Sequence, residues 1–161
     1  MPATENIALM KRWFEEIWNQ GRMETVRELL DEKATGFGQA GHETEIHGPE
    51  GFIAFAQALR AAFPDIKTTD EDMFGSDDHV AVRWSADMTH TGAGLGIPPS
   101  NRKVHVTGMT MVRFANGKIV AGWDNWDQLA LMRQIGAVPE AHASHPTLIH
   151  SKNAEQGASG N

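Results

Sequence analysis

The stretch GWDNWDQL, residues 122–129, places two aspartates and two tryptophans within eight positions. Aromatic bulk beside an acid is typical of a carboxylate in an apolar pocket, and equally of a helix cap beside a core. A carboxylate in apolar surroundings has a raised pKa and can exchange protons near neutral pH. These residue types therefore indicate general acid/base chemistry by Asp124 or Asp127.

The sequence on either side distinguishes the two aspartates. Asp127 directly precedes QLALMRQIG (128–136), which has the apolar spacing of a short helix that ends at Gly136. Aspartate is a preferred N-cap residue, so we expect a structural role for Asp127. Asp124 lies near the end of the strand-like segment KIVAGWDNW (118–126) and is the candidate catalytic residue.

The face on which Asp124 lies depends on the turn after the preceding strand, KVHVTGMTMVRF (103–114). A three-residue ANG loop pairs Gly108 with Asp124 and leaves space across from the carboxylate. A two-residue Asn-Gly turn would instead set Asp124 against Met109 and reverse the face. We favour the three-residue loop, which places the small residues Gly108 and Thr110 on the face of Asp124, in a substrate pocket.

The elements that must position these residues follow from hydrophobic periodicity. Helices first and antiparallel strands after them predict an α+β fold in a single domain, residues 1–138. The polar tail, residues 139–161, is expected to be disordered. Helices are expected over 5–20, 23–30, 49–63 and 128–136, strands over 66–74, 79–90, 103–114 and 118–126, and a short strand with a loop over 34–48.

Further candidate site residues lie on the faces of these elements. The strand 79–90 carries Trp84 on its apolar face, and we expect this indole to contact a flat ligand. His90 ends the same strand and is a candidate catalytic proton shuttle at the cavity mouth. Each aromatic candidate has the alternative of being a plain core residue. The other candidates for substrate contact are Trp126, Phe14 and Trp18.

Composition argues against several function classes. The formal net charge of −7 disfavours nucleic acid or an anionic membrane as the main partner. The chain has no cysteine, which removes disulfides and thiolate zinc sites. It has no signal-like start and no apolar run of transmembrane length, so we expect a cytoplasmic protein. The histidines that could suggest a metal site lack a recognised ligand spacing, and none is expected: His42, His47, His142, His145 and His150.

Two segments, WFEEIWNQGRMETVRELL and GIPPSNRKVHVTGMTMVRFANGKIVAGWDNWDQLALMRQIG, resemble the SnoaL-like polyketide cyclase family of the nuclear transport factor 2-like superfamily. The spaced signature Gly-Ile-Pro-Pro, Arg-Phe, Gly-Lys-Ile-Val, Trp and Gln-Ile-Gly carries the resemblance, which covers roughly residues 5–138. It implies a cone, in which a strongly curved antiparallel sheet wraps around N-terminal helices and leaves an internal apolar cavity. It also implies a homodimer that associates through its sheets.

The resemblance further implies an aldol cyclase that closes a polyketide ring without a cofactor, with Asp124 at the position of the acid/base. The strand before it carries polar side chains in those cyclases, and the matching positions here are Gly108 and Thr110. We therefore expect a cofactor-free cyclase or isomerase that acts on an enolisable aromatic or polyketide-like carbonyl compound. The alternative, which Gly108 and Thr110 favour, is a non-catalytic binder of a hydrophobic small molecule.

The long strands also carry more apolar residues than one core can use. Val104, Val106 and Val112 alternate with Met109 and Met111 on the opposite face. A second apolar face usually marks an interface, so the residues themselves also predict association of two copies.

Overall fold

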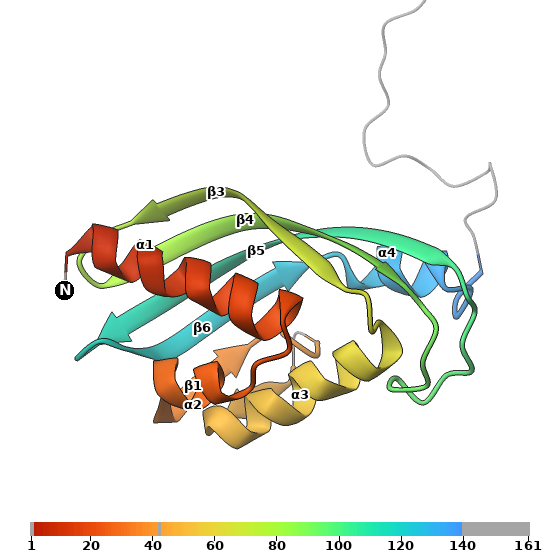
Figure 1. The fold of residues 1–161 in the computed structure, drawn as a ribbon, viewed down its shortest axis with the longest axis horizontal. Coiled ribbons are helices and arrows are strands. Elements are labelled where there is room, and N and C mark those ends of the chain that lie inside the picture. The colour runs from red at the N-terminus through yellow and green to blue at the C-terminus, as the bar shows by residue number, and fades with distance from the viewer. Residues whose placement is uncertain (1, 42, 140–161) are drawn as a thin grey trace, which may run out of the picture.

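The computed structural model describes residues 2–41 and 43–139, and their arrangement confirms the α+β class (Figure 1). Most of the predicted disordered tail, from residue 140 on, lies outside the described residues. The elements are α1 (Ala3–Arg12), η1 (Trp13–Asn19), α2 (Glu24–Leu29), β1 (Leu30–Phe37), β2 (Glu45–His47), α3 (Gly48–Ala62), β3 (Lys67–Gly75), β4 (His79–Thr89), β5 (Lys103–Ala115), β6 (Lys118–Trp126) and α4 (Gln128–Gln134).

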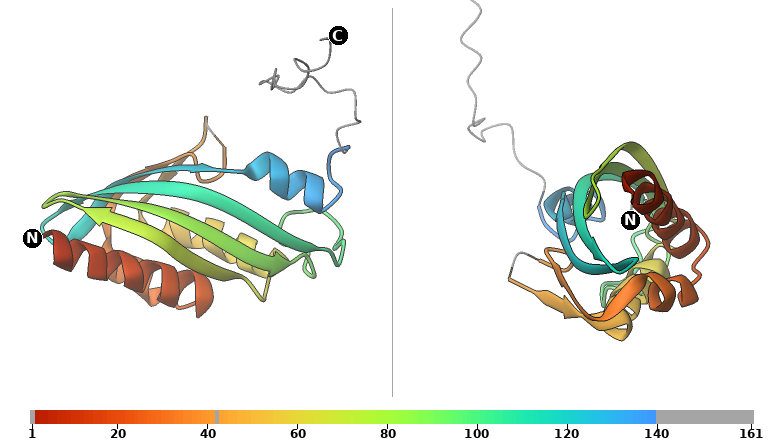
Figure 2. Two further views of the ribbon diagram at one scale, coloured as in Figure 1. Left: turned by 90° about the horizontal axis from the view of Figure 1, so that it is seen from above. Right: turned by 90° about the vertical axis from the view of Figure 1, so that its left-hand side faces the viewer.

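The described strands form one six-stranded sheet in the order β2-β1-β6-β5-β4-β3. Its neighbours pair antiparallel except β1 and β6, which run parallel, so the sheet is mixed and not fully antiparallel as we predicted. Figure 2 shows the sheet curling around the helices, with α1 and α3 on its inner side. The expected cone, a curved sheet wrapped around N-terminal helices, is confirmed.

The alternating residues of β4 and β5 direct one face of the sheet into the core. β5 is buried at every second residue, and its inward valines pack with Val80 and Val82 of β4 or with α3 and α4 residues. The outward face keeps Met109 61% exposed and Met111 44% exposed. The period-two pattern thus separates a buried wall from an outer face on which these two methionines are exposed.

The first predicted helix is continuous, but its second half is a π-helix, η1. Its wider hydrogen-bonding pattern is visible where the Gln20 N–H donates to the Glu15 carbonyl at 3.0 Å. A π-turn fits one more residue into each turn and is frequent at functional sites. Here it carries Trp13, Phe14 and Trp18, which all face the interior cavity.

The predicted three-residue loop between β5 and β6 is wrong. Asn116 and Gly117, both with positive φ, form a two-residue turn that pairs Ala115 with Lys118. A bulge then leaves Val120 unpaired and restores the expected face. The register differs from the prediction, because Asp124 pairs with Thr110, while Gly108 pairs with Trp126.

The structure can be searched for membrane-spanning helices and for metal-binding groups, which the composition argued against. Within residues 2–41 and 43–139, no helix is long and apolar enough to cross a membrane. The same residues contain no group of three His, Asp or Glu side chains that could hold a metal ion. His47 instead lies beside Glu45, with Nε2 3.4 Å from a carboxylate oxygen. His42, His142, His145 and His150 lie outside the described residues.

The predicted role of Asp127 as a helix cap is confirmed. Its carboxylate accepts a hydrogen bond from the Ala130 N–H at 2.9 Å, and α4 starts at the next residue. Gly136, with φ of 78°, follows the helix in the left-handed conformation expected of its stop. α4 therefore begins just after β6, the strand that carries Asp124.

We expect Asp127→Ala to lower the free energy of unfolding by about 1 kcal/mol, because α4 loses its N-cap. Asp127→Asn should leave that free energy nearly unchanged, since asparagine caps a helix as well as aspartate does. Urea denaturation of the two variants measures the difference. Equal destabilisation by both substitutions would show that the charge of Asp127, rather than its capping hydrogen bond, stabilises α4.

Candidate active site

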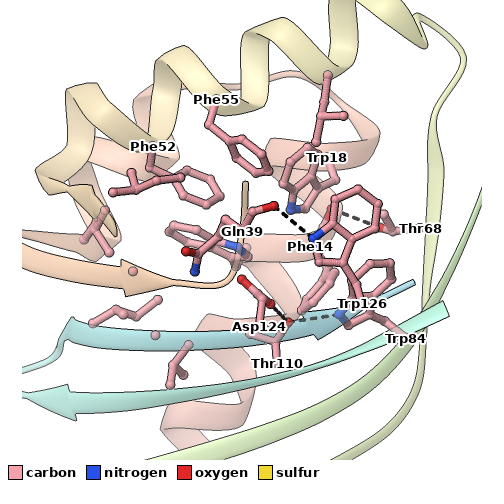
Figure 3. Close-up of a pocket in the computed structure, with 18 of the residues that line it drawn as sticks. Phe14, Trp18, Gln39, Phe52, Phe55, Thr68, Trp84, Thr110, Asp124 and Trp126 are labelled. Atoms are coloured by element: carbon pink, nitrogen blue, oxygen red, sulfur yellow. Dashed lines mark hydrogen bonds between the residues drawn. The ribbon is translucent and has the colours of Figure 1, made fainter. Parts of the chain in front are cut away.

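A cavity lies between the inner face of the sheet and the helices η1 and α3 (Figure 3). Its wall is mostly apolar, and aromatic rings project into it from both sides. Trp84 and Trp126, on neighbouring sheet strands, lie with ring centroids 6.5 Å apart. The aromatic residues of the lining are Trp13, Phe14, Trp18, Phe52, Phe55, Trp84 and Trp126.

Asp124 is the one ionisable residue among the described residues that line this cavity. It lies on β6 with its carboxylate turned inward, opposite the aromatic rings of η1 and α3 (Figure 3). Burial in this apolar wall raises the pKa of Asp124 to about 6, against hydrogen bonds from Thr110 and Gln39 that lower it. The cavity therefore holds a carboxyl group that can lose and regain a proton near neutral pH.

A chain of two hydrogen bonds determines that Thr110 acts as a donor to Asp124. The Trp84 Nε1–H donates to the Thr110 Oγ1 at 2.9 Å. That hydroxyl has a single proton, which it donates to the Asp124 carboxylate. Because Thr110 acts as a donor, it favours the ionised form of Asp124, which is the form needed to remove a proton.

Gln39, which we did not predict, is the other polar side chain beside Asp124. It lies in the loop after β1, is 5% exposed, and its side-chain amide, as a hydrogen-bond donor, lowers the pKa of Asp124. The Trp126 Nε1–H donates to the backbone carbonyl of Gln39 at 2.9 Å, and this bond joins the loop to β6. The glycine-rich segment around Gln39 has no periodicity, so only the contact across 87 positions reveals the residue.

Most of the predicted contact residues do gather in this cavity. Trp84, Thr110 and Trp126 line it from the sheet, and Phe14 and Trp18 line it from η1. Their roles in binding substrate stay predictions, because no ligand is present to contact them. What the structure adds is that these residues surround a single carboxylate.

Gly108 does not line the cavity, although we expected it to leave space beside Asp124. A Cβ atom there would lie 2.4 Å from Trp84 Cζ2 and 2.6 Å from Trp126 Cβ. The Trp84 indole and the Cβ atom of Trp126 occupy the space above Gly108. The missing side chain thus makes room for aromatic rings of the wall rather than for a ligand.

His90 is separated from Asp124 and is not part of the cavity lining. It is fully buried, with its ring against Phe63 at a centroid distance of 5.3 Å. Its Nδ1 accepts the Ser100 N–H at 3.1 Å. The alternation placed His90 correctly on the inner face, but at the far end of β4, where a proton shuttle to Asp124 has no support from the structure.

The model of the SnoaL-like polyketide cyclase family matches residues 8–135, which is most of the chain. The matched region includes both the aromatic π-helix and Asp124. The chain belongs to this family. It is 28% identical over 131 residues to the aklanonic acid methyl ester cyclase DnrD of Streptomyces peucetius, covering 81% of this chain and 90% of that protein.

Solved structures of SnoaL-like proteins show the same fold. A SnoaL-like protein from Jannaschia sp. CCS1 is 28% identical, with a TM-score of 0.76, over 85% of this chain and 95% of that chain. IdmH from Streptomyces antibioticus is 31% identical, with a TM-score of 0.69, over 80% of this chain and 96% of that chain. Membership of the SnoaL-like family agrees with the resemblance found in the sequence and supports cyclase chemistry in general.

Proposed function

We propose that this SnoaL-like protein closes a ring by an intramolecular aldol reaction, with Asp124 as the acid/base and no cofactor. The observation that carries the proposal is that Asp124 is the one ionisable group among the described residues of an aromatic cavity, with a pKa of about 6. A base with a pKa near the working pH is suited to proton transfer at carbon.

The proposed reaction uses Asp124 twice. Its carboxylate removes a proton from the carbon next to a substrate carbonyl and becomes a carboxylic acid. The resulting enolate attacks a second carbonyl of the same molecule, so a carbon–carbon bond forms and that oxygen becomes an alkoxide. The alkoxide takes the proton from Asp124, which returns to its initial form. The product is an isomer of the substrate.

The substrate class follows from the wall of the cavity. Rings from η1, α3 and two sheet strands surround Asp124, which suits a flat aromatic compound with an enolisable side chain (Figure 3). The first panel of compounds to be tried includes aklanonic acid methyl ester, which appears in the name of the relative from Streptomyces peucetius. Simple enolisable aromatic ketones such as 1-tetralone complete the panel.

To test the proposal, each compound of the panel is incubated with the protein in deuterium oxide. A catalyst of this kind should introduce deuterium at the carbon next to the carbonyl, and should convert a substrate with a second carbonyl into a cyclic isomer of changed retention. Mass spectrometry after liquid chromatography measures both. Binding of these compounds without exchange or ring closure would contradict the proposal and favour the second candidate.

The second candidate is a non-catalytic binder of a hydrophobic small molecule in the same cavity. Two indole N–H groups of the wall are already used, since Trp84 donates to Thr110 and Trp126 donates to the Gln39 carbonyl. Neither is left to stabilise an enolate oxygen, which would be the largest contribution to catalysis. The exchange experiment separates the two candidates directly.

We also propose that the protein is a homodimer that associates through the outer face of β5 and β6. Met109 and Met111 are exposed there, and Met111 pairs with the half-buried Trp123. Light scattering at micromolar concentration should give about twice the chain mass of 17.7 kDa. Met109→Lys with Met111→Lys should shift the protein to monomers, and a monomer mass for the unchanged protein would refute the proposal.

A further inference from the structure

Gln39 places an unused hydrogen-bond acceptor in the cavity wall. Its side chain lines the cavity and is 5% exposed, yet its Oε1 atom is buried with no hydrogen-bond partner. A buried carbonyl oxygen without a partner is uncommon in native proteins and calls for a partner that is absent from the protein itself. A ligand in the cavity would provide one.

The absence of a side chain at Gly36 makes the space that the Gln39 amide occupies. Gly36 of β1 pairs with Gly122 of β6, and both line the cavity. A Cβ on Gly36 would lie 2.8 Å from both the Oε1 and the Nε2 of Gln39, and one on Gly122 would lie 3.9 Å from Nε2. The amide therefore rests over a pair of residues that have no side chains.

Asp124 determines which way this amide points. An ionised carboxylate only accepts hydrogen bonds, so the Nε2 end of Gln39 must face Asp124. The Oε1 end is then left for another group. Because an amide oxygen only accepts, that group must be a donor such as a hydroxyl, beside the atom that Asp124 contacts.

We propose that Gln39 recognises a hydroxyl group of the ligand through Oε1 while its Nε2 holds the Asp124 carboxylate, so that the preferred ligand is an aromatic ketone with a hydroxyl near its enolisable carbon. This inference rests on the proposed function for the role of Asp124. It adds a substrate feature that the apolar wall does not specify.

The test compares two probes that differ in one donor. In 4-hydroxy-1-tetralone the hydroxyl lies two carbons from the enolisable carbon, and 4-methoxy-1-tetralone keeps the oxygen but removes its proton. Titration of the intrinsic tryptophan fluorescence gives both dissociation constants. The unchanged protein should bind the hydroxyl compound about threefold to tenfold more tightly, the effect of one neutral hydrogen bond.

Two variants should remove this preference, bringing the ratio of the two dissociation constants close to one. Gln39→Met keeps the length of the side chain without an acceptor. Gly36→Ala keeps Gln39 but displaces its amide, and the displaced atoms belong to a flexible side chain, so the fold should survive. A preference for the hydroxyl compound that persists in both folded variants would overturn the proposal, as would its absence from the unchanged protein.

Gln128→Met is the matched control. Gln128 holds the same loop, since its Nε2 donates to the Gly38 carbonyl at 3.2 Å, but it does not line the cavity. This variant should keep the preference for the hydroxyl compound. Loss of the preference in Gln128→Met as well would show that loop anchoring, not Oε1, causes it.

The readout is binding, so it is independent of turnover. A preference that depends on Gln39, in a protein that exchanges no deuterium into any ketone, would support the recognition of a hydroxyl and contradict the catalytic proposal. Deuterium exchange in a protein that shows no preference for the hydroxyl compound would support the catalytic proposal and contradict the recognition of a hydroxyl. The two proposals can therefore fail separately.

Discussion

Replacement of Asp124 by asparagine is expected to lower the rate of proton exchange at the ketone carbon by about 10²–10⁴-fold. Asparagine keeps the shape of the side chain but cannot take up a proton. The cavity, its aromatic wall and the Thr110 donor all remain, so ligand binding should change little. Deuterium uptake by 1-tetralone, measured by proton NMR for both proteins at pH 7.5, gives the ratio of rates.

Asp127→Asn is the control for this substitution, since it makes the same chemical change at an exposed helix cap three residues away. It should keep the full exchange rate. If Asp124→Asn were fully active while Asp127→Asn lost activity, the catalytic and structural roles of the two aspartates would be reversed.

The difference in stability between Asp124→Asn and the unchanged protein should depend on pH. The folded-state pKa of about 6 lies above the ordinary aspartate value of 3.8, so ionisation of Asp124 opposes folding. This destabilisation is absent below pH 3.8, grows as the pH rises towards 6, and is complete above it. The melting temperature of the asparagine variant should therefore gain on that of the unchanged protein between about pH 4 and pH 6, and should keep this gain at higher pH.

Gly38→Ala is expected to lower the free energy of unfolding by about 2–4 kcal/mol, the largest effect on stability that we predict. Gly38 has φ of 84°, which a residue with a Cβ adopts only at a cost. That Cβ would also lie 2.1 Å from the carbonyl oxygen of Asp124, a backbone atom that cannot rotate away. β6 must shift at Asp124 itself. Urea denaturation measures the loss.

Gly96→Ala separates the two causes of this loss. Gly96 has a similar φ of 69°, but no atom lies within 4 Å of an added Cβ. It should cost only the backbone strain, roughly 1–2 kcal/mol. Equal losses in the two variants would mean that the Gly38 backbone is not packed closely against the Asp124 carbonyl.

The fold was predictable because its signals are local. β4 and β5 alternate at every second residue, and that period alone determines which face is buried. The Asp127 cap was equally predictable, since N-cap chemistry depends on adjacent residues. Asp124 could be placed on the inner face from the same alternation, and the family resemblance supported it.

The register at the site was not predictable, because it depends on contacts between distant segments. The bulge that skips Val120 lies where the Phe114 N–H donates to the carbonyl of Asp78, in the turn before β4, at 2.7 Å. Without the bulge, the two-residue turn would have turned Asp124 outward. The neighbours of the carboxylate, Thr110 and Gln39, follow from this non-local detail.

His90 shows a related limit. Alternation gives the face of a strand but not the position along the cavity at which a residue lies. β4 carries Trp84 beside the carboxylate and carries His90 past the cavity to Phe63. A period-two pattern treats both residues alike.

The proposed chemistry depends on an apolar cavity that keeps the Asp124 carboxyl titrating near neutral pH. Carbon-13 NMR of protein labelled at aspartate side-chain carboxyls, recorded from pH 3 to pH 8, measures this directly, and Asp124→Asn identifies the signal. We predict one inward carboxyl with a pKa of about 6. An Asp124 signal that titrates near its ordinary value of 3.8 would contradict the account, because such a group would be a weak base for removing a proton from carbon.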